Sequence, residues 1–230
     1  MSRANMDKNP QEVAAMFDGV ARRYDIVNDL LSLGRTKAWR RAATKVIAPA
    51  PGMKILDMAA GTGSSSAPLA AAGADVIAAD FSEGMIAAGK KARPDLTFIK
   101  ADALNLPFDN NAFDLFTISF GLRNTQNTAK ALAEARRVVK PGGRLVVVEF
   151  SSPTFAPFRA IYMNYLMRAL PFIARKTSSN PDAYIYLADS IRAWPDQKAL
   201  ASQIVDAGWT QVGWKNLTGG VVAIHMAVAP

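Results

Sequence analysis

The spacing of hydrophobic residues changes from a helical to a strand-like pattern near residue 50. Residues 10–48 read as helical, and their clearest apolar helix face comprises Trp39, Ala42, Ala43, Val46 and Ile47. Pro49 and the pair Pro51-Gly52 are expected to end this helical part of the chain.

Short apolar segments then alternate with helical ones as far as residue 150. The segments expected to form strands are residues 53–58, 74–80, 96–101, 113–120 and 144–150. The segments expected to form helices between them are residues 64–72, 82–93 and 128–139, and Ser82 is expected to cap the second. Apolar strands that alternate with helices are typical of a buried parallel sheet, so we predict an α/β fold.

The pattern changes again after Ser151. Residues 155–193 are expected to form two helices, and residues 195–207 another that ends at Gly208. Two final strands, residues 210–216 and 221–228, are expected to form a hairpin that adds an antiparallel edge to the sheet. The length of 230 residues fits one domain.

Composition excludes several kinds of site. The chain has no cysteine, which excludes disulfides and cysteine nucleophiles, and His225 is its one histidine, so no metal site is expected. No apolar run reaches the ~18–20 residues of a membrane span, and the N-terminus has no apolar stretch typical of a secretory signal, so we expect a cytoplasmic protein. The net charge of +8 suits nucleic acid or an anionic membrane, although an ordinary soluble protein can also be basic.

The first expected strand runs into a loop of small residues, 57–63, with the sequence DMAAGTG. Gly61 and Gly63 would let a ligand approach the backbone at the end of the strand, where such sheets bind nucleotides. The loop matches neither G-x-G-x-x-G nor a P-loop, so it lacks a pyrophosphate cradle. A single G-x-G is weak by itself, because tight turns use the same residues.

Two aspartates end the next two expected strands. Asp80 could accept both ribose hydroxyls of an adenosine, and its alternative role as a helix cap is weaker because Ser82 can cap that helix. Asp102 could accept from an adenine amino group, or it could be a solvated strand-end residue. The loop and the two acids together favour S-adenosylmethionine over NAD as the cofactor.

These features resemble the class I S-adenosylmethionine-dependent methyltransferases. More narrowly, almost the full chain resembles the family that C-methylates demethylmenaquinol and the ubiquinone precursor. The blocks that carry this resemblance are residues 16–25 with Asn28 and 32–34, residues 118–124 (ISFGLRN), residues 188–192 with 195–197, and residues 216–220. The resemblance implies a Rossmann-like sheet, mostly parallel with an antiparallel edge hairpin and helices on both faces.

The resemblance also implies a set of cofactor-binding residues. The residues expected to contact the cofactor or to shape its loop are Gly61, Thr62, Gly63, Asp80, Asp102, Ala103 and Ser119. The chain departs from many relatives at Ala59-Ala60, where they have a glycine. Alanine is expected to fit there if the local φ is negative.

The implied activity is C-methylation of demethylmenaquinol to menaquinol, the last step of menaquinone biosynthesis. The short N-terminus and residues 190–197 (SIRAWPDQ) favour the menaquinone branch over a dual enzyme that also accepts a polyprenyl methoxy-benzoquinol. An RNA methyltransferase is a more distant alternative. No N/D-P-P-aromatic motif follows the fourth expected strand, and basic residues are spread along the chain, so we expect no nucleic-acid partner.

Arg123 and His225 are the candidate catalytic residues. Arg123 follows the fourth expected strand, and because arginine stays protonated it would stabilise a phenolate or orient a proton-accepting water. Its alternative role is a structural pair with an acid. His225 has a suitable pKa for a base, but its place in an apolar strand makes a core role equally plausible.

Candidate substrate-binding residues come from two segments. Tyr24, Asp25 and Asn28 belong to the first family signature, where capping of a lid helix is the alternative role. Tyr162 and Tyr165 lie in residues 158–174, an apolar segment that could hold a polyprenyl tail, rest on anionic membrane, or pack against the core. We expect peripheral association at the inner face of the cell membrane, and homo-oligomerisation is left open.

The expected organisation is one methyltransferase domain over residues 1–230. Its parts are an N-terminal helical lid (1–50), a cofactor-binding core (51–150), a helical substrate insert (151–193), and a C-terminal helix with edge strands (194–230).

Overall fold

A computed structural model describes residues 8–9, 11–13, 15, 34–169 and 181–230. Most of the expected N-terminal lid, including Tyr24, Asp25 and Asn28, therefore lies outside the described residues. No helix among the described residues is long and apolar enough to cross a membrane.

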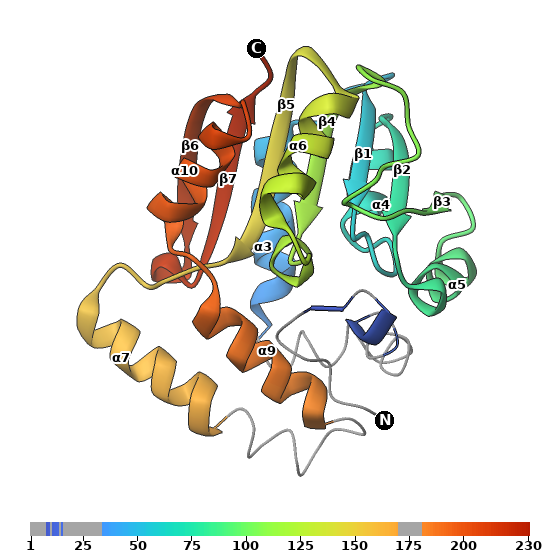
Figure 1. The fold of residues 1–230 in the computed structure, drawn as a ribbon. Coiled ribbons are helices and arrows are strands. Elements are labelled where there is room, and N and C mark those ends of the chain that lie inside the picture. The colour runs from blue at the N-terminus through green and yellow to red at the C-terminus, as the bar shows by residue number, and fades with distance from the viewer. Residues whose placement is uncertain (1–7, 10, 14, 16–33, 170–180) are drawn as a thin grey trace.

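A seven-stranded sheet with the order β3-β2-β1-β4-β5-β7-β6 forms the centre of the molecule (Figure 1). Its strands are β1 (Lys54–Met58), β2 (Asp75–Asp80), β3 (Thr97–Lys100), β4 (Phe113–Ser119), β5 (Val139–Phe150), β6 (Thr210–Leu217) and β7 (Val222–Val228). The first five strands pair in parallel, and β7 pairs antiparallel with both β5 and β6. The α/β prediction and the antiparallel edge hairpin are confirmed.

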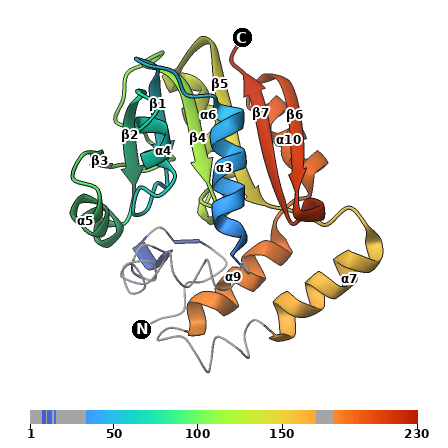
Figure 2. The same ribbon diagram turned by 180° about the vertical axis from the view of Figure 1, so that it is seen from behind.

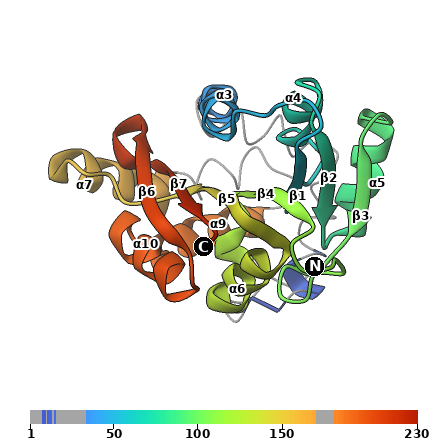
Figure 3. The ribbon, with the colours of Figure 1, turned by 90° about the horizontal axis from the view of Figure 1, so that it is seen from above.

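Helices cover both faces of the sheet, as Figure 3 shows from above. The α-helices are α3 (Arg35–Ile47), α4 (Ser66–Ala70), α5 (Glu83–Ala92), α6 (Thr128–Val138), α7 (Ala156–Asn164), α9 (Pro181–Ala193) and α10 (Gln197–Asp206). The shorter helical segments among the described residues are the 3-10 turns η1 (Leu122–Asn124) and η3 (Thr218–Gly220) and the π-helical η2 (Tyr165–Ala169). Ser82 caps α5 as expected, because its hydroxyl accepts a hydrogen bond from the Met85 N–H.

The two faces carry separate parts of the core. On one face, helix α3 lies against the sheet (Figure 2). Its residues Trp39 and Ile47 pack with sheet residues such as Leu115. On the other face, Leu132 of α6 and Ile204 of α10 pack against a second apolar layer. Burial of a side chain of this size contributes about 1.5–3 kcal/mol, so these layers hold the helices on the sheet.

Strand β5 begins earlier than the sequence indicates. The sequence indicated a helix as far as residue 139 and a strand from residue 144, yet β5 starts at Val139 and contains Pro141, Gly142 and Gly143. The two glycines stay in the sheet because Gly142 N–H donates to Ala229 O at 2.9 Å and Ala229 N–H donates to Gly143 O at 2.8 Å. A register shift against β4 absorbs the irregular residues.

Candidate functional site

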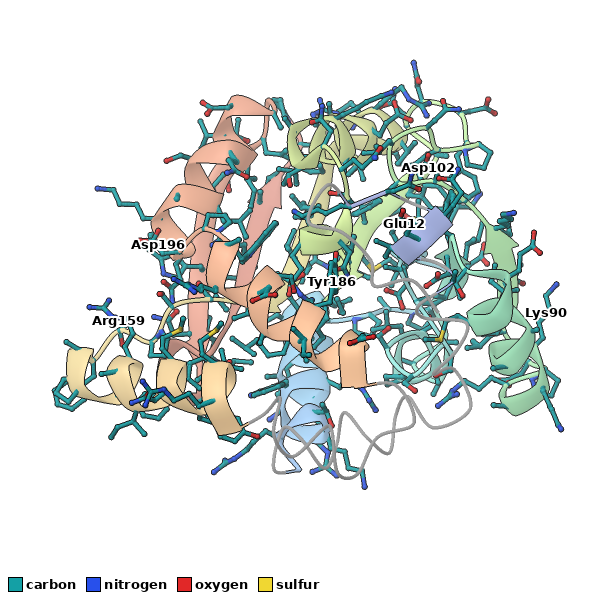
Figure 4. The ribbon with its side chains drawn as sticks, turned by 60° about the horizontal axis from the view of Figure 1, so that its bottom comes forward. Glu12, Lys90, Asp102, Arg159, Tyr186 and Asp196 are labelled. Carbon is teal, nitrogen blue, oxygen red and sulfur yellow. The ribbon has the colours of Figure 1, made fainter. Side chains whose placement is uncertain are left out.

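A cavity of about 730 Å³ opens at the carboxyl ends of the parallel strands. Its wall combines the loop after β1, the ends of β2 and β4, and residues of α3, α7 and α9. The sequence-predicted residues that line it are Gly61, Thr62, Asp80, Asp102, Ala103, Ser119, Arg123, Tyr162 and Tyr165. In Figure 4, Tyr186 of α9 lies near the centre of this end, while Arg159 stands on the outer side of α7.

The loop after β1 turns through three residues with positive φ. Gly61 and Gly63 have φ of +56° and +79°, and a Cβ on Gly63 would lie 2.8 Å from the Phe98 ring. Gly63 shapes the loop without lining the cavity. Ala59 has a φ of +55°, so the condition on which alanine was expected to fit, a negative φ, is not met there, and the loop carries strain of about 1–2 kcal/mol at this residue.

Asp80 connects the loop to the end of β2. Its Oδ2 accepts the Gly61 N–H at 2.8 Å, and its Oδ1 accepts the Ser82 N–H at 2.9 Å. These two backbone hydrogen bonds fix the positions of both carboxylate oxygens beside the cavity that Asp80 lines. This geometry fits a pair of ribose hydroxyls.

Asp102 and Ala103 form the neighbouring part of the cavity wall. The Oδ1 of Asp102 accepts the Leu104 N–H at 2.8 Å, which fixes the carboxylate beside the backbone of Ala103. Because a carboxylate accepts and the adjacent peptide can donate, this edge of the cavity offers both partners that an adenine amino group and ring nitrogen need.

Asp57 lies fully buried beneath the loop, and the sequence analysis assigned it no role. The Ser65 and Ser66 hydroxyls donate to its Oδ2 at 2.7 Å and 2.6 Å. Burial raises the pKa of the Asp57 carboxyl to about 6, against the lowering effect of the two serine hydrogen bonds. Its Oδ1 and the hydroxyl of Thr117, which is its paired residue on β4 and lines the cavity, have no hydrogen-bond partner among the described residues.

Arg123 lies on η1 and forms a buried ion pair with Glu149 at the end of β5. The Arg123 side chain is 5% exposed and that of Glu149 1%, and the Arg123 Nη1 lies 2.8 Å from the Glu149 Oε1. Nη1 also donates to the Phe120 carbonyl at 2.5 Å, and Nε donates to the Ser190 hydroxyl at 3.4 Å. The acid partner that the sequence analysis left open is therefore present, and Arg123 also lines the cavity. Glu149 was missed because its pairing with Arg123 is a long-range contact.

Three tyrosines line the cavity beyond Arg123, two of which the sequence analysis named. Burial raises the pKa of Tyr162, Tyr165 and Tyr186, so all three stay neutral at physiological pH and can donate hydrogen bonds. The Tyr186 hydroxyl already donates to the Asn124 Oδ1 at 3.3 Å.

His225 lies in the core and does not line the cavity. It is 1% exposed on β7, its Nε2 lies 2.9 Å from the Gln197 carbonyl, and its ring packs against Trp214 at 5.9 Å between centroids. Burial lowers the pKa of His225, which keeps it neutral. Of the two candidate catalytic residues, the structure brings only Arg123 to the cavity.

Comparisons with known proteins point to one family. A model of the ubiE/COQ5 methyltransferase family matches residues 5–229. The demethylmenaquinone methyltransferase of Renibacterium salmoninarum is 61% identical over 227 residues, covering 99% of this chain and 96% of the relative. The demethylmenaquinone methyltransferase of Streptomyces avermitilis is 60% identical over 225 residues, covering 98% of this chain and 97% of the relative.

Solved structures share the fold at low sequence identity. The [4+2]-cyclase SpnF has a TM-score of 0.71 at 17% identity, with 96% of each chain covered. Phosphoethanolamine N-methyltransferase 2 of Haemonchus contortus, in complex with S-adenosyl-L-methionine, has a TM-score of 0.61 at 15% identity over 83% of this chain and 52% of that chain.

Proposed function

The chain belongs to the ubiE/COQ5 methyltransferase family, and from that membership we infer that it C-methylates demethylmenaquinol to menaquinol with S-adenosylmethionine as methyl donor. It is an S-adenosylmethionine-dependent methyltransferase. The observation that supports this substrate is the full-length identity of about 60% to demethylmenaquinone methyltransferases. The reaction is the last step of menaquinone biosynthesis.

The cavity fits this cofactor. Asp80 presents a carboxylate at the end of β2 to the ribose, and Asp102 with Ala103 presents an acceptor and a backbone edge to the adenine. Thr62 and Ser119 also line the cavity. When bound, S-adenosylmethionine supplies an electrophilic methyl group.

Arg123 stabilises the negative charge that develops on the quinol oxygen. A ring carbon becomes a strong nucleophile when the phenol beside it loses its proton, and a fixed cation lowers the free energy of that phenolate. The Glu149 carboxylate and the Phe120 carbonyl hold the guanidinium in place, so little reorganisation is needed. Tyr162, which burial keeps neutral, adds a hydroxyl donor without competing for the proton.

The rest of the cavity wall suits an apolar substrate and excludes water from the ring. Phe158, Ile161 and Leu166 extend the lining from Arg123 toward α7. We assign this arm to the start of the polyprenyl tail, together with Tyr162 and Tyr165. A polar nucleotide would gain no favourable contact with these apolar side chains, which disfavours the RNA alternative.

Peripheral contact with anionic membrane at the inner face of the cell membrane is part of the proposal. Helix α7 has no buried residue, and Phe155 and Ile161 are 66% and 68% exposed. Arg159 and Arg168 are exposed nearby, and residues 151–169 contain no acidic residue. Apolar side chains flanked by arginines favour an anionic lipid surface, from which an insoluble substrate could enter beside Ile161.

The membrane contact is tested by flotation of the protein with vesicles of anionic or neutral lipid. Ile161→Glu should weaken flotation with anionic vesicles, while Val205→Glu, at a residue on α10 that is 54% exposed, should leave it unchanged. Equal flotation of both variants would refute a contact through α7.

The activity is tested by transfer of labelled methyl from S-adenosylmethionine to reduced demethylmenaquinone, to a reduced polyprenyl methoxy-benzoquinone, and to total RNA. Label on the naphthoquinol alone is the expected result. Label on both quinols would make the enzyme dual, and label on RNA alone would refute the assignment.

A further inference from the structure

Three aromatic side chains meet beside Arg123 in the cavity wall. Trp39 comes from α3, Phe120 from the end of β4, and Phe150 from the end of β5, and all three line the cavity. The ring centroids lie 5.9 Å apart for Trp39 and Phe120, 6.2 Å for Trp39 and Phe150, and 5.1 Å for Phe120 and Phe150. We call these three residues the aromatic wall.

The aromatic wall is held rigidly. The Trp39 indole N–H donates to the Thr218 hydroxyl at 2.8 Å, and the indole is almost fully buried. The Phe120 N–H donates to the Val148 carbonyl at 2.8 Å. Phe120 has a φ of +58°, a strained conformation for an aromatic residue, of the kind that persists where a binding site requires it.

The aromatic wall adjoins the cation of the site. The Arg123 guanidinium lies over the Phe150 ring, 5.1 Å from its centroid, and Phe120 supplies the carbonyl that Arg123 Nη1 contacts. A flat molecule with an oxygen against Arg123 would therefore place its ring against aromatic side chains.

We propose that the aromatic wall binds the fused hydrocarbon ring of a naphthoquinol, and that Trp39 makes the cavity prefer a naphthoquinol to a methoxy-benzoquinol. This assignment rests on the proposed function. A second aromatic ring gains contact with the wall, whereas a methoxy oxygen in its place would lose its water and find no donor, because the Trp39 N–H is already bonded to Thr218.

The preference is measured with the full chain and S-adenosylmethionine under reducing conditions. The KM for reduced demethylmenaquinone with a short prenyl tail is compared with the inhibition constant Ki of the reduced methoxy-benzoquinone with the same tail. Loss of a small apolar contact changes discrimination by about 10-fold to 200-fold, and Trp39→Phe removes part of a ring, so the ratio Ki/KM should fall about tenfold. The fall should come from a higher KM for the naphthoquinol.

Trp209→Phe is the matched control. Trp209 is a buried tryptophan on the other face of the sheet, its indole N–H donates to the Leu132 carbonyl at 3.1 Å, and it does not line the cavity. The Trp209→Phe variant should lose stability as Trp39→Phe does, and it should keep the wild-type ratio Ki/KM. An unchanged ratio in Trp39→Phe, or an equal fall in both variants, would overturn the proposal.

Binding of S-adenosylmethionine, measured by calorimetry, distinguishes a failure of the proposed function from a failure of the aromatic-wall assignment. A wild-type protein that binds the cofactor and methylates neither quinol would overturn the proposed function and the aromatic-wall assignment with it. A wild-type protein that methylates demethylmenaquinol while Trp39→Phe keeps the ratio would overturn the aromatic-wall assignment alone.

Discussion

The methyl group of Ala59 fills the space that a Cβ atom on Gly121 would need. Ala59 lies in the loop after β1 with a φ of +55°, and Gly121 precedes η1 with a φ of −110°. This contact joins the loop that we assign to the cofactor to the turn that carries Arg123. The strained backbone of Ala59 therefore places its methyl group where only a residue without a side chain, Gly121, leaves room for it.

Gly121→Ala should destabilise the protein, and Ala59→Gly should rescue it. The φ of Gly121 suits alanine, so the loss comes from the collision with Ala59 and disappears when Ala59 becomes glycine. We expect a coupling of about 1–3 kcal/mol in a double-mutant cycle of unfolding free energies. Additive effects of the two substitutions would show that the two segments relax independently.

Arg123→Ala should lower kcat by about 100-fold to 1000-fold, the usual loss when a donor to a developing oxyanion is removed. The affinity for S-adenosylmethionine should stay unchanged, because the residues assigned to the cofactor are elsewhere. Steady-state kinetics and calorimetry provide the two measurements.

A loss of stability could imitate this effect, because Glu149 would remain buried without its partner. Such a loss amounts to about 3–5 kcal/mol. The double variant Arg123→Met with Glu149→Met removes both charges and should recover stability without recovering kcat. Recovery of kcat in the double variant would refute a direct role of Arg123.

The sequence predicted the elements of the fold better than their arrangement. Hydrophobic periodicity and turn residues located every strand that the structure describes, because both signals depend on residues that are neighbours in the sequence. They did not predict that β7 lies between β5 and β6, although the continuous apolar run of β7 and the polar residues of β6 agree with inner and edge positions. The pairing of β7 with β5 is a long-range contact that local periodicity does not encode.

The residues of the site also differ in whether local sequence or long-range packing places them. Gly61, Asp80 and Asp102 lie at the ends of their strands or just after them, so motif spacing was enough to place them. Trp39 reaches the cavity from α3, and Glu149 reaches the Arg123 side chain from β5, and both contacts depend on the packing of distant parts of the chain. His225 shows the opposite case, a residue of suitable chemistry that the fold places in the core.

Asp80→Asn should weaken S-adenosylmethionine binding at least tenfold and leave the fold intact. An amide retains one acceptor oxygen, and its nitrogen would face either the Gly61 N–H or the Ser82 N–H, so the acceptor pair for the ribose is lost. Asp75→Asn, at the exposed start of the same strand, is the control and should bind as wild type does. Equal affinities of the two variants would remove Asp80 from the cofactor site.

The contribution of Asp57 to the free energy of unfolding should fall as the pH rises from 5 to 7.5. Its pKa is about 6 in the folded state and near 3.8 when unfolded, so the folded protein binds a proton more tightly over this range. A group with a raised folded-state pKa contributes stability that is fully present below pH 3.8 and is lost as the pH rises through 6. The loss between pH 5 and pH 7.5 is about 1.4 kcal/mol.

Comparison with Asp57→Asn isolates this contribution, because asparagine does not titrate. Its amide oxygen can accept from Ser65 and Ser66, and its NH₂ can donate toward the unpartnered Thr117 hydroxyl on the paired strand. Relative to wild type, the variant should therefore gain about 1.4 kcal/mol in unfolding free energy between pH 5 and pH 7.5. Asp114→Asn is the control and should show no such change over this range, because its hydrogen bond with Lys140 lowers the pKa of Asp114 below 3.8, and a lowered carboxyl loses its contribution only at more acidic pH. Parallel stability curves for wild type and Asp57→Asn would mean that the Asp57 carboxyl stays ionised in the folded protein despite its burial.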